Sequence, residues 1–173
     1  MPPMKFVALL AAASLVPATV RTDAPAPAAA EAQMVKVTVL STMLAGDPGR
    51  GIGEWGFAAL LEVDGRKLLI DTGARPGTVL QNARELGVDL STVEEVVLTH
   101  NHGDHVNGLV SLRRELQGRN PRALAVAHVV PAIFLSRKGR DGRELNGLLP
   151  HRADFEALGG RFVEHDGAVE LSP

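Results

Sequence analysis

The stretch Val96-Val97-Leu98-Thr99-His100-Asn101-His102-Gly103-Asp104-His105 decides the fold of this chain. Its three apolar residues predict the end of a buried strand, and four side chains that can bind metal follow within six residues. In an extended chain, residues i and i+2 point the same way, so His100 and His102 should converge. We expect Asp104 to cap the next helix and His105 to begin it, which brings both beside the first pair.

This arrangement predicts two adjacent metal positions, one with two imidazoles and one with a carboxylate and an imidazole. The chain has no cysteine, which excludes thiolate ligands, disulfides and cysteine nucleophiles. Nitrogen and oxygen ligands favour one or two Zn²⁺ ions, with Fe or Mn as alternatives. A bound ion lowers the pKa of its water to about 7, so the motif predicts hydrolysis by a metal-bound hydroxide. A surface cluster of histidines is the alternative, but a buried strand before the motif and a helical pattern after it argue against that alternative.

Outward from the motif, apolar periodicity predicts an alternation of strands and helices. Asp64-Gly65 joins two apolar runs and is typical of a two-residue type I′ hairpin turn. Residues 137–146 are charged and contain glycine, which predicts a mobile loop. We expect helices at 78–86, 106–116 and 153–158, a short helix from Pro131, and strands at 35–40, 57–63, 66–70, 93–98, 123–130, 161–164 and 168–171.

The composition supports a single α/β domain. The chain has 173 residues, of which 45% are hydrophobic and 22% are charged, and its net charge is −2. This near-neutral balance argues against a nucleic-acid partner, which would require a basic surface. We therefore expect a small-molecule substrate.

The first 32 residues predict export. Met1–Lys5 carries one positive charge, Phe6–Val20 is apolar, and an Ala/Pro-rich linker follows. This pattern is typical of a secretory signal peptide, and the apolar run is too short for a stable membrane span. Cleavage after Ala32 or after Ala18 fits, and an uncleaved anchor or a misassigned start codon is the alternative. We expect a bacterial-type periplasmic or secreted protein whose folded domain is 33–173.

The motif 99–105 resembles the signature of the metallo-β-lactamase superfamily, and the hairpin before Asp71-Thr72-Gly73 resembles that superfamily's opening strands. The resemblance implies an αββα sandwich of the α/β class. It also implies that His100 and His102 bind one metal and that Asp104 and His105 bind a second. Asp104 would also position the attacking water. Asp71 would steady the motif from behind the ligands.

Two further stretches indicate a branch of that superfamily. GEWGFAALLEV and AHVVPAIF resemble the dihydropterin-type enzymes, which are similar to an aminobenzene-phosphate ribofuranosyl pterin synthase. Members of the superfamily complete the metal site with ligands from later segments, which have no counterpart before Pro173. We therefore expect the N-terminal half of the fold, with the C-terminal half truncated.

This departure leaves two functions open. The chain is a hydrolase of ester, lactone or phosphoester substrates, or it is a catalytically incomplete metal-binding fragment or module. A half-fold also exposes a sheet edge and an apolar face, so we expect self-association.

The remaining motifs have competing interpretations. His128 ends a predicted strand and could line the pocket or approach a metal, but an ordinary strand-end histidine is favoured. His151 and His165 are expected at the surface. The Gly51–Gly56 stretch matches G-x-G-x-x-G, but a strand pattern follows it, so we reject a dinucleotide site. Asp71-Thr72-Gly73 also resembles retroviral-type aspartic proteases, which the downstream helices argue against.

Overall fold

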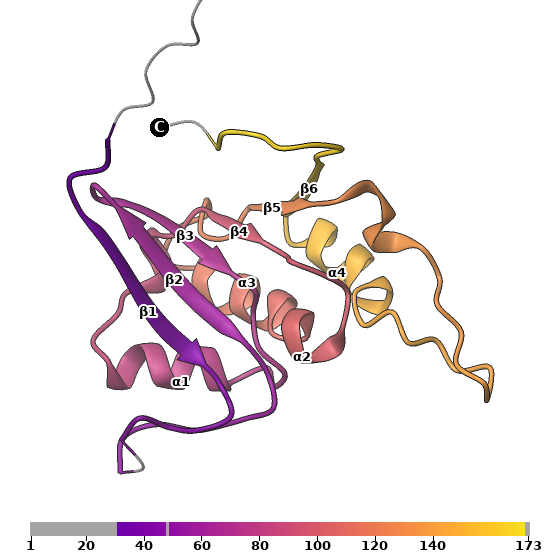
Figure 1. Ribbon diagram of the computed structural model, residues 1–173, viewed down its shortest axis with the longest axis horizontal. Coiled ribbons are helices and arrows are strands. Elements are labelled where there is room, and N and C mark those ends of the chain that lie inside the picture. Colours follow the sequence, from indigo (N-terminus) through magenta and orange to yellow (C-terminus); the bar gives the residue numbers. More distant parts are fainter. Residues whose placement is uncertain (1–30, 48, 172–173) are drawn as a thin grey trace, which may run out of the picture. The chain divides into compact units, whose positions relative to one another are not determined.

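The computed structural model describes residues 31–47 and 49–171, and the part from Ala32 onward forms one compact unit. The predicted signal peptide lies almost entirely outside the described residues. Six strands form one mixed sheet in the order β1-β2-β3-β4-β5-β6 (Figure 1). The strands are β1 (Val35–Ser41), β2 (Ala58–Val63), β3 (Arg66–Ile70), β4 (Glu95–Val97), β5 (Val126–Val129) and β6 (Arg161–Glu164).

The pairs β1–β2 and β2–β3 are antiparallel, and the pairs β3–β4, β4–β5 and β5–β6 are parallel. Asp64 and Gly65, the two residues between β2 and β3, both have positive φ, 48° and 87°. These angles confirm the predicted type I′ turn, whose twist matches that of the strands it joins. The antiparallel half therefore forms by local pairing, whereas the parallel half needs crossover connections through helices.

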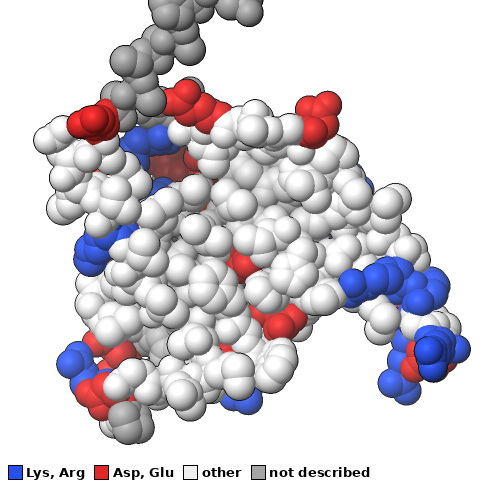
Figure 2. All heavy atoms as spheres, viewed as in Figure 1, with Lys and Arg blue, Asp and Glu red and all other residues white. Residues whose placement is uncertain are grey.

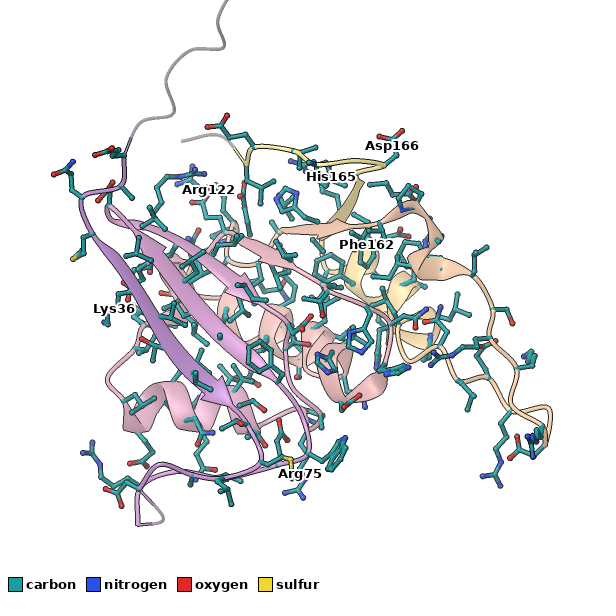
Figure 3. The ribbon with its side chains drawn as sticks, viewed as in Figure 1. Lys36, Arg75, Arg122, Phe162, His165 and Asp166 are labelled. Atoms are coloured by element: carbon teal, nitrogen blue, oxygen red, sulfur yellow. The ribbon has the colours of Figure 1, made fainter. Side chains whose placement is uncertain are left out.

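Helices cover one face of the sheet. The central strands place Leu60, Leu69 and Val96 on this face, where they share a core with Val79 of α1 and Leu112 of α3. Phe162 of β6 (labelled in Figure 3) points to the same side and packs against Phe155 of α4, with the ring centroids 4.9 Å apart. The helices are α1 (Thr78–Glu85), α2 (Gly103–Val106), α3 (Leu109–Gln117) and α4 (Arg152–Ala157), and the 3-10 turns are η1 (Leu90–Thr92), η2 (Pro131–Phe134) and η3 (Leu149–His151).

The structure corrects four expectations. Residues 168–171 are not a strand. The predicted helix over 106–116 is two helices, because α2 begins at Gly103 and α3 at Leu109. The predicted strands over 93–98 and 123–130 are limited to Glu95–Val97 and Val126–Val129. Residues 137–146 contain no helix or strand, as predicted for a loop, and an isolated bridge joins Lys138 to Glu144 across a turn. In the described part of the chain, no helix is long and apolar enough to cross a membrane.

Candidate metal centre

The predicted motif lies at the carboxyl ends of two neighbouring parallel strands. Asp71 follows β3 directly, and Thr99 and His100 follow β4 after a single intervening residue. The backbone N–H of Asp71 donates to the carbonyl of Val97 (2.9 Å), which joins the two strand ends. The Asp71 backbone has a positive φ of 56°, a rare conformation for a residue with a side chain. Such strained backbone is found mainly at functional sites.

The side chain of Asp71 is fully buried, and its carboxylate accepts hydrogen bonds from three groups of the motif. Its Oδ1 accepts a hydrogen bond from the Thr99 backbone N–H (2.8 Å), and its Oδ2 accepts one from the Thr99 hydroxyl (2.7 Å). Oδ2 also accepts from Nδ1 of His105 (2.8 Å). Because a carboxylate only accepts, this bond assigns the proton of His105 to Nδ1. The lone pair on Nε2 of His105 is therefore available to a metal ion.

A second relay orients His100. The Thr99 hydroxyl already donates to Asp71, so it can only accept from Nδ1 of His100, 3.0 Å away. This assignment leaves Nε2 of His100 as the basic nitrogen. Burial lowers the pKa of His100, and the neighbouring His105 and His102 lower it further, which favours the neutral ring that binds metals.

The motif side chains lie close together. The ring centroids of His100 and His102 are 4.6 Å apart, and those of His100 and His105 are 4.0 Å apart. Nε2 of His105 lies 3.7 Å from Oδ2 of Asp104. The structure therefore brings all four predicted ligands together. Within residues 31–47 and 49–171, however, no three His, Asp or Glu side chains are arranged to hold a metal ion as they stand.

The donor chemistry nonetheless fits a divalent ion. Two of the three imidazoles have Nδ1 engaged by an acceptor, so their Nε2 atoms are free as ligands. A carboxylate lies beside them. Buried acceptors behind the ligand imidazoles are the usual support of a metal-binding histidine.

Asp104 does not have the helix-capping role expected for it. The N-cap position of α2 is His102, whose backbone is extended, and Asp104 lies in the first turn. The helix begins earlier because the N–H groups of His105 and Val106 both bond to the His102 carbonyl, at 3.0 and 3.2 Å. The Asp104 carboxylate therefore does not cap the helix, and its Oδ2 atom lies 3.7 Å from Nε2 of His105.

A buried carboxylate that the sequence analysis missed fastens the loop before β2 to the turn after Asp71. Glu54 is 4% exposed and accepts hydrogen bonds from the Ser41 hydroxyl (2.6 Å) and the backbone N–H groups of Ala74 and Arg75 (both 3.0 Å). Gly73 has a positive φ of 78°, and a Cβ there would lie 2.5 Å from a Glu54 oxygen. Glu54 belongs to the rejected glycine stretch, whose loop leads into a strand as predicted.

Backbone hydrogen bonds join neighbouring segments of the chain to the motif. The N–H of Phe57 donates to the Asp104 carbonyl (3.1 Å), and that of Gly147 donates to the Asn101 carbonyl (2.7 Å). A Cβ on Gly108 would overlap the Thr72 carbonyl oxygen, so only glycine permits this approach between α3 and the turn after β3.

His128 lies with another histidine, not with the motif. Its Nδ1 is 2.9 Å from Nε2 of His165, and its own Nε2 lies 3.5 Å from Oε2 of Glu95. Burial lowers the pKa of His128, against the opposing charge of Glu95. His165 follows β6 directly (Figure 3) and is half-buried, so it is less exposed than expected.

His151 also departs from its predicted surface position. It is half-buried, and its Nε2 lies 3.3 Å from Oδ1 of Asn107, the residue after α2. Burial lowers the pKa of His151. The segment before α4 therefore reaches the motif helix, a long-range contact that no local pattern indicates.

The hydrogen bonds of Asp71 also exclude the aspartic-protease alternative. Its carboxylate is buried beneath Thr99 and His105 and cannot meet a substrate. The mixed sheet thus has helices on one face and carries the histidine motif directly beside Asp71, at the carboxyl ends of β3 and β4.

The model of the metallo-beta-lactamase superfamily matches residues 56–165. The chain therefore belongs to the metallo-beta-lactamase superfamily. The match begins just before β2 and includes the motif and the whole of β4, β5 and β6.

Two curated relatives are similar to parts of the chain. The 7,8-dihydropterin-6-methyl-4-(beta-D-ribofuranosyl)-aminobenzene-5'-phosphate synthase of Methanocaldococcus jannaschii is 29% identical over 146 residues, 80% of this chain and 48% of the relative. A ribonuclease Z of Clostridium botulinum is 34% identical over 71 residues, 40% of this chain and 22% of the relative. The chain thus spans about half the length of the first relative and less of the second.

A solved structure shows the same fold. A crystal structure of a protein from Thermotoga maritima, described as a metallo-beta-lactamase, aligns with a TM-score of 0.51 at 19% identity. The alignment covers 80% of this chain and 62% of the other chain. The α/β sheet is therefore confirmed as part of a metallo-beta-lactamase fold.

Proposed function

We propose that the chain is a metal-dependent hydrolase whose site is the 99–105 motif. The observation that carries the proposal is the hydrogen bond from Nδ1 of His105 to the buried Asp71, with the parallel relay from His100 through Thr99. Both relays leave Nε2 as the ring nitrogen with the lone pair, and the two ring centroids are 4.0 Å apart. A structural histidine pair has no need of such support, whereas a metal ligand does.

The proposed ligands divide as the resemblance implies. His100 and His102 would hold one ion, and His105 and Asp104 would hold a second, with Zn²⁺ as the first choice and Fe or Mn as alternatives. When bound, such an ion lowers the pKa of its water to about 7 and polarises the bond to be broken. The Asp104 carboxylate would also position the attacking water. Asp71 would keep the His105 ring fixed while charge develops.

The relatives favour a phosphoester substrate over a carboxylic ester or lactone. One relative is named as a ribonuclease and the other as an aminobenzene-phosphate synthase. We propose a small phosphoester as substrate. The formal charge of −2 on the whole chain offers little attraction for a polyanion such as RNA.

Turnover of a panel of model compounds tests the proposal. The purified full chain, loaded with Zn²⁺ or Mn²⁺, would be assayed with bis(p-nitrophenyl) phosphate, p-nitrophenyl phosphate, p-nitrophenyl acetate and a lactone. We expect the diester to be hydrolysed fastest. His102→Ala should lower that rate at least 100-fold, whereas His165→Ala, a histidine outside the motif, should leave it within a few-fold of wild type.

The outcomes separate the two functions that the sequence leaves open. Tightly held metal without turnover of any compound would show a metal-binding module whose site is incomplete. Absence of both metal binding and turnover would contradict both functions. Equal loss of rate in His102→Ala and His165→Ala would place the activity elsewhere or in a contaminant.

A further inference from the structure

A basic arm projects from the segment between η2 and η3. It consists of residues 137–144, in which four cations outnumber two acids, whereas the whole chain has a net charge of −2. Figure 1 shows it in orange, folding back on itself away from the helices, and Figure 2 shows Lys and Arg gathered at its outer end. Lys and Arg are almost never fully buried without a partner, so the arm faces solvent whatever packs on the sheet. The cations are Arg137, Lys138, Arg140 and Arg143.

Backbone hydrogen bonds give the arm a defined conformation. The N–H of Gly139 donates to the Arg143 carbonyl (2.9 Å), and the N–H of Leu145 donates to the Arg137 carbonyl (2.7 Å). Gly142, in the turn between them, has a positive φ of 77°, which glycine adopts at little cost. The arm therefore presents its side chains from a closed turn.

The two acids of the arm help to hold this turn. Glu144 accepts hydrogen bonds from the Ser136 hydroxyl and from the backbone N–H groups of two neighbouring residues, and these bonds lower its pKa to about 2. Asp141 accepts from the Arg143 backbone N–H (3.1 Å), and its Oδ2 lies 3.3 Å from Nε of the same arginine. The Arg143 side chain is nonetheless 85% exposed, and Arg140 has no acidic partner among the described residues. The cations at the turn are thus only partly neutralised by the arm itself.

The base of the arm is fixed to the metal motif. The N–H of Gly147 donates to the Asn101 carbonyl (2.7 Å). The side-chain amides of Asn101 and Asn146 both donate to the Ile133 carbonyl, at 3.0 and 2.7 Å. A Cβ on Gly147 would lie 2.7 Å from the backbone of Gly103, so only glycine permits this approach. The arm is therefore held in a set position relative to the motif.

An open hollow of about 650 Å³ lies between the motif helix α2 and the arm. Gly103 and Asn107 line it on one side, and residues 144–147 line it on the other. Its volume is in the range of sites that take small molecules. Gly103 directly follows His102, so the hollow begins beside a proposed metal ligand and ends at the arm.

We propose that the basic arm binds a second phosphate group of the substrate, remote from the bond that is hydrolysed. This inference rests on the proposed function and specifies its substrate as a small phosphodiester that carries a further, terminal phosphate. Guanidinium groups suit such a phosphate, because their N–H donors match two of its oxygens at once. An arm with about four residues on each side reaches on the order of 13 Å, which sets the scale of the distance between the two phosphates.

Matched pairs of substrates test the proposal. Each pair consists of p-nitrophenyl phosphodiesters of a linear alkanediol with four, eight or twelve carbons, whose far hydroxyl is either phosphorylated or free. The zinc-loaded full chain should hydrolyse the phosphorylated member of a longer pair with a KM at least 5-fold lower and a similar kcat. Binding that is equal in the ground state and the transition state changes KM alone. Added salt should reduce this advantage, because the arm is exposed.

A double substitution at the turn tests whether the arm carries the preference. Arg140→Gln with Arg143→Gln should raise the KM of the phosphorylated compound to within twofold of that of its free partner. Arg122→Gln is the matched control and should keep the preference. Arg122, labelled in Figure 3, is 77% exposed and precedes β5, at the ends of the strands opposite the motif. Calorimetry on the metal-free chain, which should not turn the compounds over, measures the same preference as binding alone.

The outcomes separate this inference from the function on which it rests. Hydrolysis of both members of every pair with equal KM would overturn the second phosphate site and leave the hydrolase standing. Equal behaviour of the double variant and Arg122→Gln would also overturn it, because the preference would then reflect overall charge. So would arm-dependent binding of a labelled oligothymidylate without any preference among the small compounds, which would assign the arm to nucleic acid. Absence of turnover with every compound would contradict the proposed function, and with it this substrate.

Discussion

Two groups of histidines in this chain differ in the hydrogen-bond partners of their Nδ1 atoms. In the motif group, His100 and His105 direct Nδ1 to Thr99 and to the buried Asp71, and their Nε2 atoms remain free. In the sheet pair, His128 and His165 engage each other, and a half-exposed Glu95 lies at the far nitrogen of His128. The proposed metal ligands thus have their Nδ1 atoms engaged by acceptors, whereas His128 and His165 face each other. Under the proposed function, these hydrogen-bond partners separate the two groups better than clustering does.

The largest expected difference between the groups is in metal binding. His102→Ala should reduce the zinc retained after loading and desalting from one or two ions per chain to well under one, because the first position loses half of its imidazoles. His165→Ala should retain the wild-type amount. Metal content by inductively coupled plasma mass spectrometry measures both, and equal retention in the two variants would contradict the assignment of the motif.

Loss of the buried Glu54, near the motif, should lower the free energy of unfolding more than loss of Glu95, beside the sheet pair. Glu54→Ala leaves the Ser41 hydroxyl and the N–H groups of Ala74 and Arg75 without their acceptor, which should cost roughly 3 kcal/mol or more. Glu95→Ala removes a side chain that is 35% exposed and should cost less than about 1 kcal/mol. Urea unfolding of both variants measures the difference. Similar costs would mean that the Glu54 network does not hold the turn after β3.

Asp71 should matter to metal affinity more than to folding. In Asp71→Asn the amide group cannot accept from Nδ1 of His105 at the Oδ2 position, so the ring loses its fixed tautomer. Loss of such a partner typically lowers metal affinity by about 10- to 100-fold. Glu95→Gln is the control and should leave the affinity unchanged. Competition with a chromophoric chelator gives both dissociation constants, and an unaltered value for Asp71→Asn would refute the relay.

The smallest effect should appear in the pH dependence of stability. Burial lowers the pKa of His128 below 6.5, so the unfolded chain takes up this proton at a higher pH than the folded chain does. The free energy of unfolding should therefore fall as the pH drops below about 6.5 and level off below the folded pKa. The slope from one group is at most about 1.4 kcal/mol per pH unit.

His128→Gln should flatten this part of the profile relative to wild type. Chemical denaturation at several pH values between 7.5 and 5 provides the comparison. Parallel profiles for the two proteins would show that His128 is not the responsible group. His100 and His151 also have pKa values lowered by burial, so only the difference between the proteins is diagnostic.

The sequence predicted those features that depend on local patterns. The hairpin at Asp64-Gly65 follows from backbone angles that few residues tolerate, and the helix at 78–85 follows from apolar periodicity. The motif predicted four side chains that do lie together. The strand expected at 168–171 does not form, because an alternating pattern is not enough without a neighbouring strand to pair with.

Other features depend on contacts between distant segments. Glu54 looks like one more loop residue until the chain folds and brings Ala74 and Arg75 to it. His151 and His165 lie in polar sequence, yet each is half-buried against an element far away in the chain. The capping role expected of Asp104 failed for a related reason: the sequence marks a helix start but does not fix it within two residues.

The most direct test of the central claim is the dependence of diester hydrolysis on a metal ion. Turnover of bis(p-nitrophenyl) phosphate would be measured in the zinc-loaded chain, again after chelation and dialysis, and once more after zinc is restored. Metal-dependent hydrolysis predicts that the rate disappears and then returns in the wild type but not in His102→Ala. A rate that survives chelation, or that returns equally in both proteins, would contradict a hydrolase built on this motif.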